Sequence, residues 1–213
     1  MRKRQDIAIG YEPAPHKQRY QNNGIAMKRL QQLISLLAAL CCQPALANDE
    51  ALWAGLRSGE QVALIRHAEA PGVGDPAGFK LGDCSTQRNL SDQGRRQAKD
   101  AGALLRSKGV SSATVYSSQW CRCLDTASGL ELGPVVPQPA LNSFFEESAR
   151  GGEQTEALRR LIRERPAGKP LVMVTHQVNI TALSGVYPQS GEIVVLRPEG
   201  EKWTVQGRIS TLK

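Results

Sequence analysis

The sequence contains no apolar run long enough to cross a bilayer. Its longest run, residues 33–42, is shorter than the ~20 residues that a transmembrane helix needs. This run follows the basic pair Lys28-Arg29 and precedes Ala45-Leu46-Ala47, which is the order of parts in a secretory signal peptide. We expect cleavage after Ala47, a periplasmic or secreted protein, and no stable membrane anchor after cleavage.

Two other interpretations of this segment stay open. The run could form an amphipathic or buried N-terminal helix, or Cys41 or Cys42 could carry a lipid, although Leu40 stands where a lipoprotein would have a small residue. Residues 1–26 are polar, basic and aperiodic. We interpret them as a disordered extension, or as sequence upstream of a true start at Met27. The predicted organisation is therefore 1–26, a signal peptide at 27–47 and one domain at 48–213.

The predicted domain also lacks a surplus of positive charge. The whole chain has a net charge of +7, but residues 1–47 hold seven Lys or Arg and only two Asp or Glu. The remaining 166 residues are left with +2. A nearly balanced domain gives no argument for nucleic acid as a partner.

Cysteine is scarce, and its spacing does not indicate a metal site. Three cysteines follow the predicted signal peptide, namely Cys84, Cys121 and Cys123. In an oxidising compartment Cys84 could pair with either Cys121 or Cys123, which leaves one thiol free. Only one residue separates Cys121 from Cys123, whereas common zinc sites have a gap of two or more. Internal repeats and low-complexity tracts are also absent from the sequence.

Histidine is scarcer still, and its placement is informative. Residues 48–213 contain only His67 and His176, and each directly follows an apolar run, residues 62–65 with Arg66 and residues 171–175. Such runs are typical of buried strands. Open α/β sheets bind their ligands at the carboxyl ends of parallel strands. The sequence therefore predicts a two-histidine site at one edge of a sheet.

Strands and helices are expected to alternate along the domain. Apolar periodicity predicts helices over 48–61, from Ser91 or Asp92 to Gly109, over 119–130, over 153–165 and over 178–183. Further strands are expected at 113–116 and 135–136, with a terminal hairpin of 193–196 and 203–205, and a long Gly- and Pro-rich loop at 70–88. This order favours an α/β fold: a three-layer α/β/α sandwich with a mixed, mainly parallel central sheet.

The polar residues at the predicted strand ends suit phosphoryl transfer. Arg66 and His67 follow one strand, Ser117, Ser118 and Arg122 follow another, and His176 follows a third. A guanidinium binds tetrahedral oxyanions through two N–H groups and keeps its charge at any ordinary pH. A neutral imidazole can attack phosphorus through a ring nitrogen.

Four ordered blocks resemble the histidine phosphatase superfamily, also called the phosphoglycerate mutase-like fold. They are Arg66-His67-Ala68-Glu69, the block Leu90-Ser91-x-x-Gly94-x-x-Gln97-Ala98, the stretch from Tyr116 through Arg122 to Thr126-Ala127, and Val174-Thr175-His176. The resemblance covers residues 62 to about 185, most of the predicted domain.

The resemblance implies roles for individual residues. His67 would be the nucleophile that forms a phosphohistidine, while Arg66, Arg122 and His176 would hold the phosphoryl oxygens. Arg88 could complete the phosphate pocket, although a solvated surface charge explains it equally well. No metal or other cofactor is implied, because the arginines neutralise the phosphoryl charge.

The proton donor departs from the family pattern. Members use a mid-chain Glu in a Leu-x-Glu context or an Asp directly after the second histidine. Here Ser143 stands where the Glu would be, and Gln177 follows His176. We take Glu146 as the candidate donor, against the alternative that Glu146 and Glu147 form a solvated acidic pair.

The sequence thus predicts an exported phosphatase of phosphomonoesters whose partner is a small phosphorylated substrate. The resemblance of a small exported member to lipopolysaccharide heptose phosphatases suggests an envelope sugar phosphate. The rivals are a non-catalytic phosphate-ligand binding module on the same fold, a phosphomutase, and a cysteine-based redox or metal protein.

Overall fold

A computed structural model describes residues 43–200 and 202–211, and its main compact unit begins at Asn48. The predicted extension 1–26 and residues 27–42 of the predicted signal peptide lie outside the described residues. The first described element is helix α2 (Gln43–Ser58), which begins before the helix predicted at 48–61. Within the described part of the chain, no helix has the length and apolarity needed to cross a membrane.

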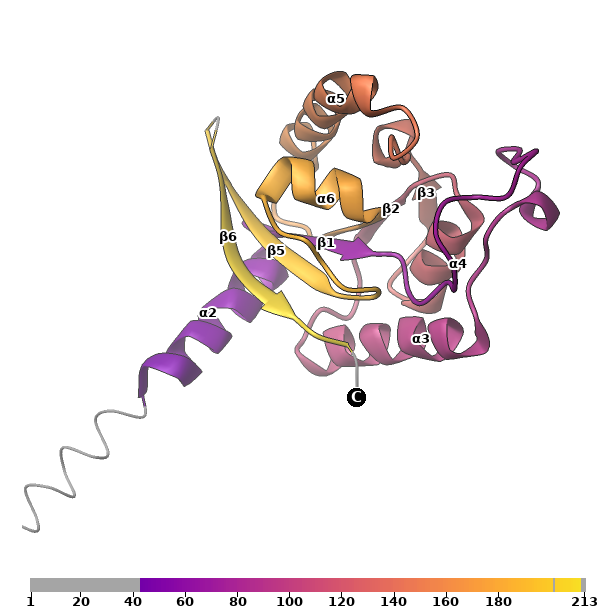
Figure 1. Cartoon of the computed structure of the whole chain (residues 1–213). Helices are drawn as coiled ribbons and strands as arrows, with labels where there is room; N and C mark the ends of the chain where they lie inside the picture. The colour runs from indigo at the N-terminus through magenta and orange to yellow at the C-terminus, as the bar shows by residue number, and fades with distance from the viewer. Residues whose placement is uncertain (1–42, 201, 212–213) are drawn as a thin grey trace, which may run out of the picture. The chain divides into compact units, whose positions relative to one another are not determined.

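A six-stranded mixed sheet forms the centre of the domain (Figure 1), in the order β3-β2-β4-β1-β5-β6. The strands β3, β2, β4 and β1 run parallel, whereas β5 is antiparallel to β1 and β6 to β5. Their bounds are β1 (Val62–Arg66), β2 (Thr114–Ser117), β3 (Val135–Pro137), β4 (Leu171–Thr175), β5 (Ile193–Glu199) and β6 (Lys202–Ile209). The predicted mainly parallel sheet is confirmed.

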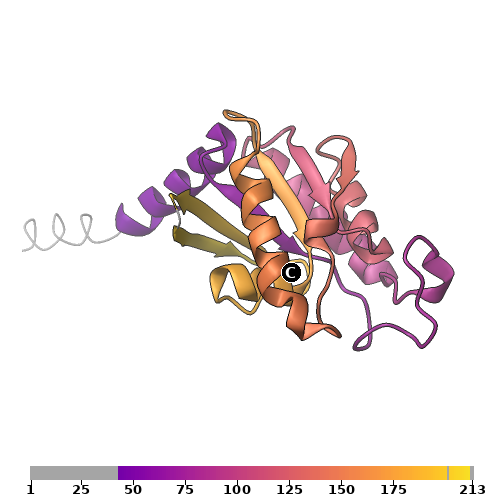
Figure 2. The same ribbon diagram turned by 90° about the horizontal axis from the view of Figure 1, so that it is seen from above.

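Helices cover both faces of this sheet, so the predicted three-layer α/β/α sandwich is also confirmed. One layer contains α2, α3 (Asp92–Ser107) and α4 (Cys121–Gly129), and the other contains α5 (Gly151–Arg163) and α6 (Gln177–Ser184). Figure 1 shows α5 and α6 on one side of the sheet and α3 on the other, and Figure 2 shows α5 lying along it.

The alternation of side chains along β1 explains the two layers. Val62 and Leu64 pack with the apolar residues of α5 and α6, whereas Ala63 and Ile65 pack with those of α2, α3 and α4. All four side chains are fully buried. A strand covered on both faces becomes continuously apolar, which is the pattern that marked this segment in the sequence.

The parallel strands bring three polar chain segments to one edge of the sheet. Arg66 pairs with Thr175 and Ser117 with Val174, so the residues after β1, β4 and β2 leave the sheet together. The long loop after β1 contains only the short 3₁₀ helix η1 (Cys84–Thr86). Two further 3₁₀ helices that the sequence did not predict, η2 (Pro139–Leu141) and η3 (Ser148–Arg150), lead into α5.

Candidate active site

His67 lies buried directly after β1 with a defined tautomer. Its Nδ1 atom is 2.8 Å from the carbonyl oxygen of Ala68. A carbonyl can only accept, so Nδ1 carries the proton and Nε2 has a free lone pair. Burial, together with the nearby charges of Arg122, Arg88 and Arg66, lowers the pKa of His67 to about 3. The imidazole is therefore neutral near pH 7, as a nucleophile must be.

His176 follows β4 and lies next to His67, with 5.6 Å between the ring centroids. Its Nε2 atom is 2.9 Å from Ser118 Oγ and 3.5 Å from Cys123 Sγ, so Nδ1 is the ring nitrogen left for a substrate. Burial and the neighbouring charges hold the pKa of His176 well below its usual value. Both histidine rings are therefore neutral near pH 7.

Three arginines surround the histidines. Arg66 donates from Nη1 to the carbonyl oxygen of Pro188 at 2.9 Å. Arg122 lies in the first turn of α4 and is almost fully buried. Arg88 comes from the long loop, where its Nε donates to the Gly74 carbonyl at 2.7 Å and its Nη1 to the Ala70 carbonyl. The guanidiniums of Arg66 and Arg122 give the cavity an electropositive floor that suits a phosphoryl group, and Arg88 adds a third positive charge from the loop.

Several residues of the family-like blocks support this floor and do not face the cavity. Thr126 Oγ1 accepts from the backbone N–H of Ala68 at 2.9 Å and donates to the Arg122 carbonyl at 2.7 Å. The two segments that carry His67 and Arg122 are thus joined by one hydroxyl. Thr126, near the end of the block that begins at Tyr116, therefore has a positioning role in this structure.

The block at residues 90–98 fixes the chain just after His67. Ser91 caps α3 and also donates to the carboxylate of Glu69, while Gln97 Oε1 accepts from the Glu69 N–H at 3.0 Å. A Cβ at Gly94 would lie 2.0 Å from the Glu69 carbonyl oxygen, so only glycine allows α3 to approach this closely. Glu69 is therefore a structural partner of α3.

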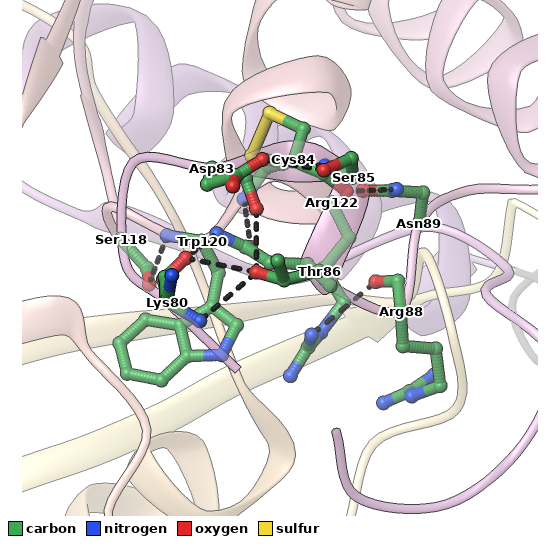
Figure 3. Close-up of a disulfide and its surroundings, with 12 residues drawn as sticks. Lys80, Asp83, Cys84, Ser85, Thr86, Arg88, Asn89, Ser118, Trp120 and Arg122 are labelled. Atoms are coloured by element: carbon green, nitrogen blue, oxygen red, sulfur yellow. Dashed lines mark hydrogen bonds between the residues drawn. A yellow bond between two sulfur atoms is a disulfide. The ribbon is translucent and has the colours of Figure 1, made fainter. Parts of the chain in front are cut away.

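A disulfide attaches the long loop to the start of α4 (Figure 3). It joins Cys84 and Cys121, whose Cα atoms are 5.7 Å apart, and leaves Cys123 free and buried. Burial raises the pKa of the Cys123 thiol to about 12, so this thiol is unreactive. The sequence allowed either pairing. Among the described residues, no group of His, Cys, Asp and Glu could hold a metal ion.

The candidate residues open into one cavity of about 390 Å³. Arg66, His67, Arg88, Arg122, His176 and Glu146 all line it, so the structure brings the whole predicted set together. Its exposed lining includes four large apolar residues, Val73, Leu81, Phe145 and Tyr187. Phe79 stacks on Trp120 at 5.0 Å between ring centroids, and Trp120 in turn meets the ring of His176 edge-on.

The acidic groups of the cavity differ in their surroundings. Glu146 and Glu147 are exposed, and Glu147 pairs with Arg150 at 3.1 Å. Gln177 binds Thr181 within α6. Asp75 was not among the predicted site residues. Its carboxylate accepts hydrogen bonds from both Nη atoms of Arg122 inside the cavity. Its only sequence signal was an acidic residue in the loop that follows the strand bearing His67.

Comparison with known proteins agrees with this geometry. Residues 62–144 match the model of the histidine phosphatase superfamily (branch 1). The protein histidine phosphatase SixA in complex with tungstate is 18% identical, with a TM-score of 0.51 over 71% of this chain and 97% of that one. A mycobacterial glucosyl-3-phosphoglycerate phosphatase in complex with VO3 is 17% identical, with a TM-score of 0.51 over 68% and 96%.

A further structure with the same fold is a mutant phosphoserine phosphatase from Entamoeba histolytica in complex with phosphoserine. It is 16% identical, with a TM-score of 0.50 over 71% of this chain and 97% of that one. No curated protein sequence matches significantly. The family match begins at β1 and includes Arg66, His67 and Arg122, whereas His176 lies beyond its end at residue 144. Residues 62–144 therefore resemble the histidine phosphatase superfamily (branch 1), and the chain shares its fold with these solved phosphatase structures.

Proposed function

We propose that the protein is an exported phosphatase that hydrolyses phosphomonoesters through a phosphohistidine on His67. One observation carries the proposal: a buried, neutral His67 with a free Nε2 lies in a cavity that Arg66, Arg88 and Arg122 also line. Nucleophile and oxyanion-binding groups are the two parts that metal-independent phosphoryl transfer requires. The match of residues 62–144 to the histidine phosphatase superfamily supports the reaction type.

The proposed reaction has two steps on the same phosphorus. His67 Nε2 attacks the phosphoryl group, the bond to the leaving oxygen breaks, and a phosphohistidine forms. Arg66, Arg122 and His176 hold the phosphoryl oxygens, and Arg88 adds positive charge from the loop. Water then attacks the phosphohistidine, the P–N bond breaks, and inorganic phosphate leaves. Charge spreading over the equatorial oxygens is stabilised by groups that are already in place.

The substrate that we propose is a small phosphorylated compound, with an envelope sugar phosphate as the expected case. The volume of about 390 Å³ lies within the range of ~300–1,000 Å³ for small-molecule pockets. Similar folds have been solved with phosphoserine, tungstate and VO3 bound. A sugar phosphate, phosphoserine and an aryl phosphate compared at equal concentration would rank these classes by kcat/KM.

Hydrolysis of p-nitrophenyl phosphate by the purified protein tests the reaction, with His67→Ala as the matched variant. We expect turnover by the wild type and a loss of about 10³-fold or more in the variant. With a ³²P-labelled phosphomonoester, label should be trapped on the wild type and not on His67→Ala in samples quenched with alkali, in which a phosphohistidine is stable. A wild type that binds phosphate without turnover would favour the non-catalytic binding module. Isomerisation of phosphoglycerate without net phosphate release would favour the phosphomutase.

Export is a separate part of the proposal. It is supported by the signal-like pattern of residues 27–47 and by the Cys84–Cys121 disulfide, because disulfides persist in oxidising compartments. Fractionation of producing cells, with mass spectrometry of the recovered chain, tests it. We expect a periplasmic or secreted protein that begins at Asn48, and a cytoplasmic protein with the segment intact would contradict export.

A further inference from the structure

The carboxylate of Asp75 lies against the arginine that is expected to hold the phosphoryl group. Arg122 donates from Nη1 to Oδ1 at 2.7 Å and from Nη2 to Oδ2 at 3.0 Å. The side chains of Arg122 and Asp75 are only 4% and 11% exposed. Asp75 also lines the cavity that contains His67. A substrate that binds Arg122 must therefore meet this carboxylate.

Two further contacts fix the carboxylate in this position. Trp120 donates from Nε1 to Oδ2 at 3.0 Å, and the backbone N–H of Arg88 donates to Oδ1 at 3.2 Å. The Cys84–Cys121 disulfide holds the same loop against the start of α4, one residue before Arg122 (Figure 3). These contacts hold Asp75 in position beside Arg122, although Asp75 lies in a loop segment without regular structure.

Cleavage of a phosphomonoester leaves an alkoxide or phenoxide that needs a proton. Within the described residues, the carboxylates that line the cavity are Asp75, Glu146 and Glu147. Glu147 is exposed and paired with Arg150. Glu146 is exposed at the cavity mouth, where its Oε1 lies 3.6 Å from the position that a Cβ would take on Gly74. Of the three, only Asp75 is bound to Arg122, the guanidinium that is expected to hold the phosphoryl group.

We propose that Asp75, and not Glu146, is the catalytic acid that protonates the leaving oxygen. The assignment rests on the proposed phosphatase function and identifies one of its catalytic residues. When His67 Nε2 forms the P–N bond and the P–O bond breaks, the carboxylic proton of Asp75 passes to the leaving oxygen and gives a neutral alcohol. In the second step the Asp75 carboxylate takes a proton from the attacking water, so that the acid is restored as phosphate leaves.

The charges around Asp75 allow its protonation state to change when substrate binds. Burial raises the pKa of Asp75, but the contacts from Arg122, Trp120 and the Arg88 N–H outweigh burial and hold that pKa below its usual value. The facing charges are Arg122 on α4 and Arg88 on the loop. A phosphoryl dianion on Arg122 engages the same donors and adds negative charge beside the carboxylate. Both effects raise the pKa of Asp75 in the complex.

Two substrates that differ in leaving group test the assignment. p-Nitrophenolate leaves easily without a proton, whereas the leaving group of phenyl phosphate is more basic and depends on the acid. For Asp75→Asn we expect kcat/KM, which reports the first step, to fall on the order of 10²-fold or more for phenyl phosphate and less than about tenfold for p-nitrophenyl phosphate. Glu146→Gln is the matched control, and it should leave the ratio of the two rates unchanged.

Two further measurements separate an acid from a residue that only positions Arg122. Asp75→Glu should recover part of the phenyl phosphate rate, because it restores a carboxyl group. The fall of the wild-type phenyl phosphate rate at alkaline pH should disappear in Asp75→Asn. Thermal unfolding of each variant shows that it is folded.

Four results would overturn the assignment. Equal loss on both substrates would make Asp75 a positioning residue. If Asp75→Asn bound inorganic phosphate more tightly and showed no selective loss of the phenyl phosphate rate, Asp75 would instead be a group that competes with phosphate for Arg122. A selective loss in Glu146→Gln would return the role to Glu146. A wild type without turnover of either substrate would instead remove the proposed function, and with it this assignment.

Discussion

The floor of the cavity and the loop wall above it are held in different ways. His67 and His176 leave neighbouring parallel strands, and Arg122 is anchored to the same region through Thr126, so the sheet sets their positions. The wall at residues 70–91 contains one short 3₁₀ helix and is held by a disulfide and by side chains that bind backbone atoms. In the proposed reaction, bond formation at phosphorus uses residues that the sheet positions, whereas proton delivery uses a residue of the loop.

The largest loss of activity is expected from Arg122→Lys, which changes the floor of the cavity. Lysine keeps the charge but loses the two-point contact, and it leaves the buried carboxylate of Asp75 poorly paired. We expect kcat/KM to fall on the order of 10³-fold for both p-nitrophenyl and phenyl phosphate, because phosphoryl binding is shared by both reactions. Steady-state kinetics measures this.

Arg150→Lys at the exposed cavity rim is the control, and it should change kcat/KM less than about threefold. If Arg122→Lys lost activity on only one of the two substrates, Arg122 would belong functionally to the wall and the division would be wrong.

A smaller effect is expected from detaching the wall. Replacing both Cys84 and Cys121 by Ser removes the covalent link between loop and α4, and we expect the free energy of unfolding to fall by about 2–4 kcal/mol. The p-nitrophenyl phosphate rate should fall less than the phenyl phosphate rate, because the sheet still holds His67 and Arg122 while Asp75 loses its anchor. Chemical denaturation and the two assays give these numbers.

The matched control is Cys123→Ala, which removes the buried free thiol and leaves the disulfide. It should not change the ratio of the two rates. Equal retention of both activities in the double variant would show that hydrogen bonds alone position the loop.

The smallest expected effect is the change of the free energy of unfolding with pH. An unfolded histidine titrates near 6.5, whereas His67 in the folded protein titrates at about 3. Between these pH values the unfolded chain binds more protons, so the free energy of unfolding falls as pH falls, by at most about 1.4 kcal/mol per pH unit for each such histidine. The lowered pKa values of His176 and Asp75 act in the same direction.

Chemical denaturation of wild type and His67→Gln at several pH values between 3 and 6.5 measures this dependence. The variant should show a shallower slope, since one titrating group has been removed. Identical slopes would mean that His67 is more open to water than its position at the end of β1 indicates.

The sequence predicted the floor much better than the wall, for a physical reason. A strand covered on both faces must be apolar, so the runs before His67 and His176 were visible without any alignment, and the register of parallel strands then brought them together. The path of a loop depends on contacts with distant residues. Gly74-Asp75-Pro76 reads as a turn, and nothing local shows that Asp75 reaches Arg122.

The disulfide illustrates the same limit. Cys121 and Cys123 lie in the same helix, and the sequence could not tell which of them faces the loop. In the structure, the Cys123 sulfur lies 3.7 Å from the Thr175 carbonyl oxygen, in the core beneath β4. That position excludes it from pairing with Cys84. The choice depends on the rotation of α4 against the sheet, which neither spacing nor composition determines.

The close approach of α3 to the chain after His67 bears on how sequences that resemble this one are interpreted. Gly94 is required by a neighbouring carbonyl, and Ser91 and Gln97 bind Glu69, but none of these three residues lines the cavity. A descendant that had lost catalysis would still need them to fold. The block that contains them therefore diagnoses ancestry and architecture, whereas only residues such as Arg66, His67 and Arg122 can distinguish a working enzyme from an inactive relative.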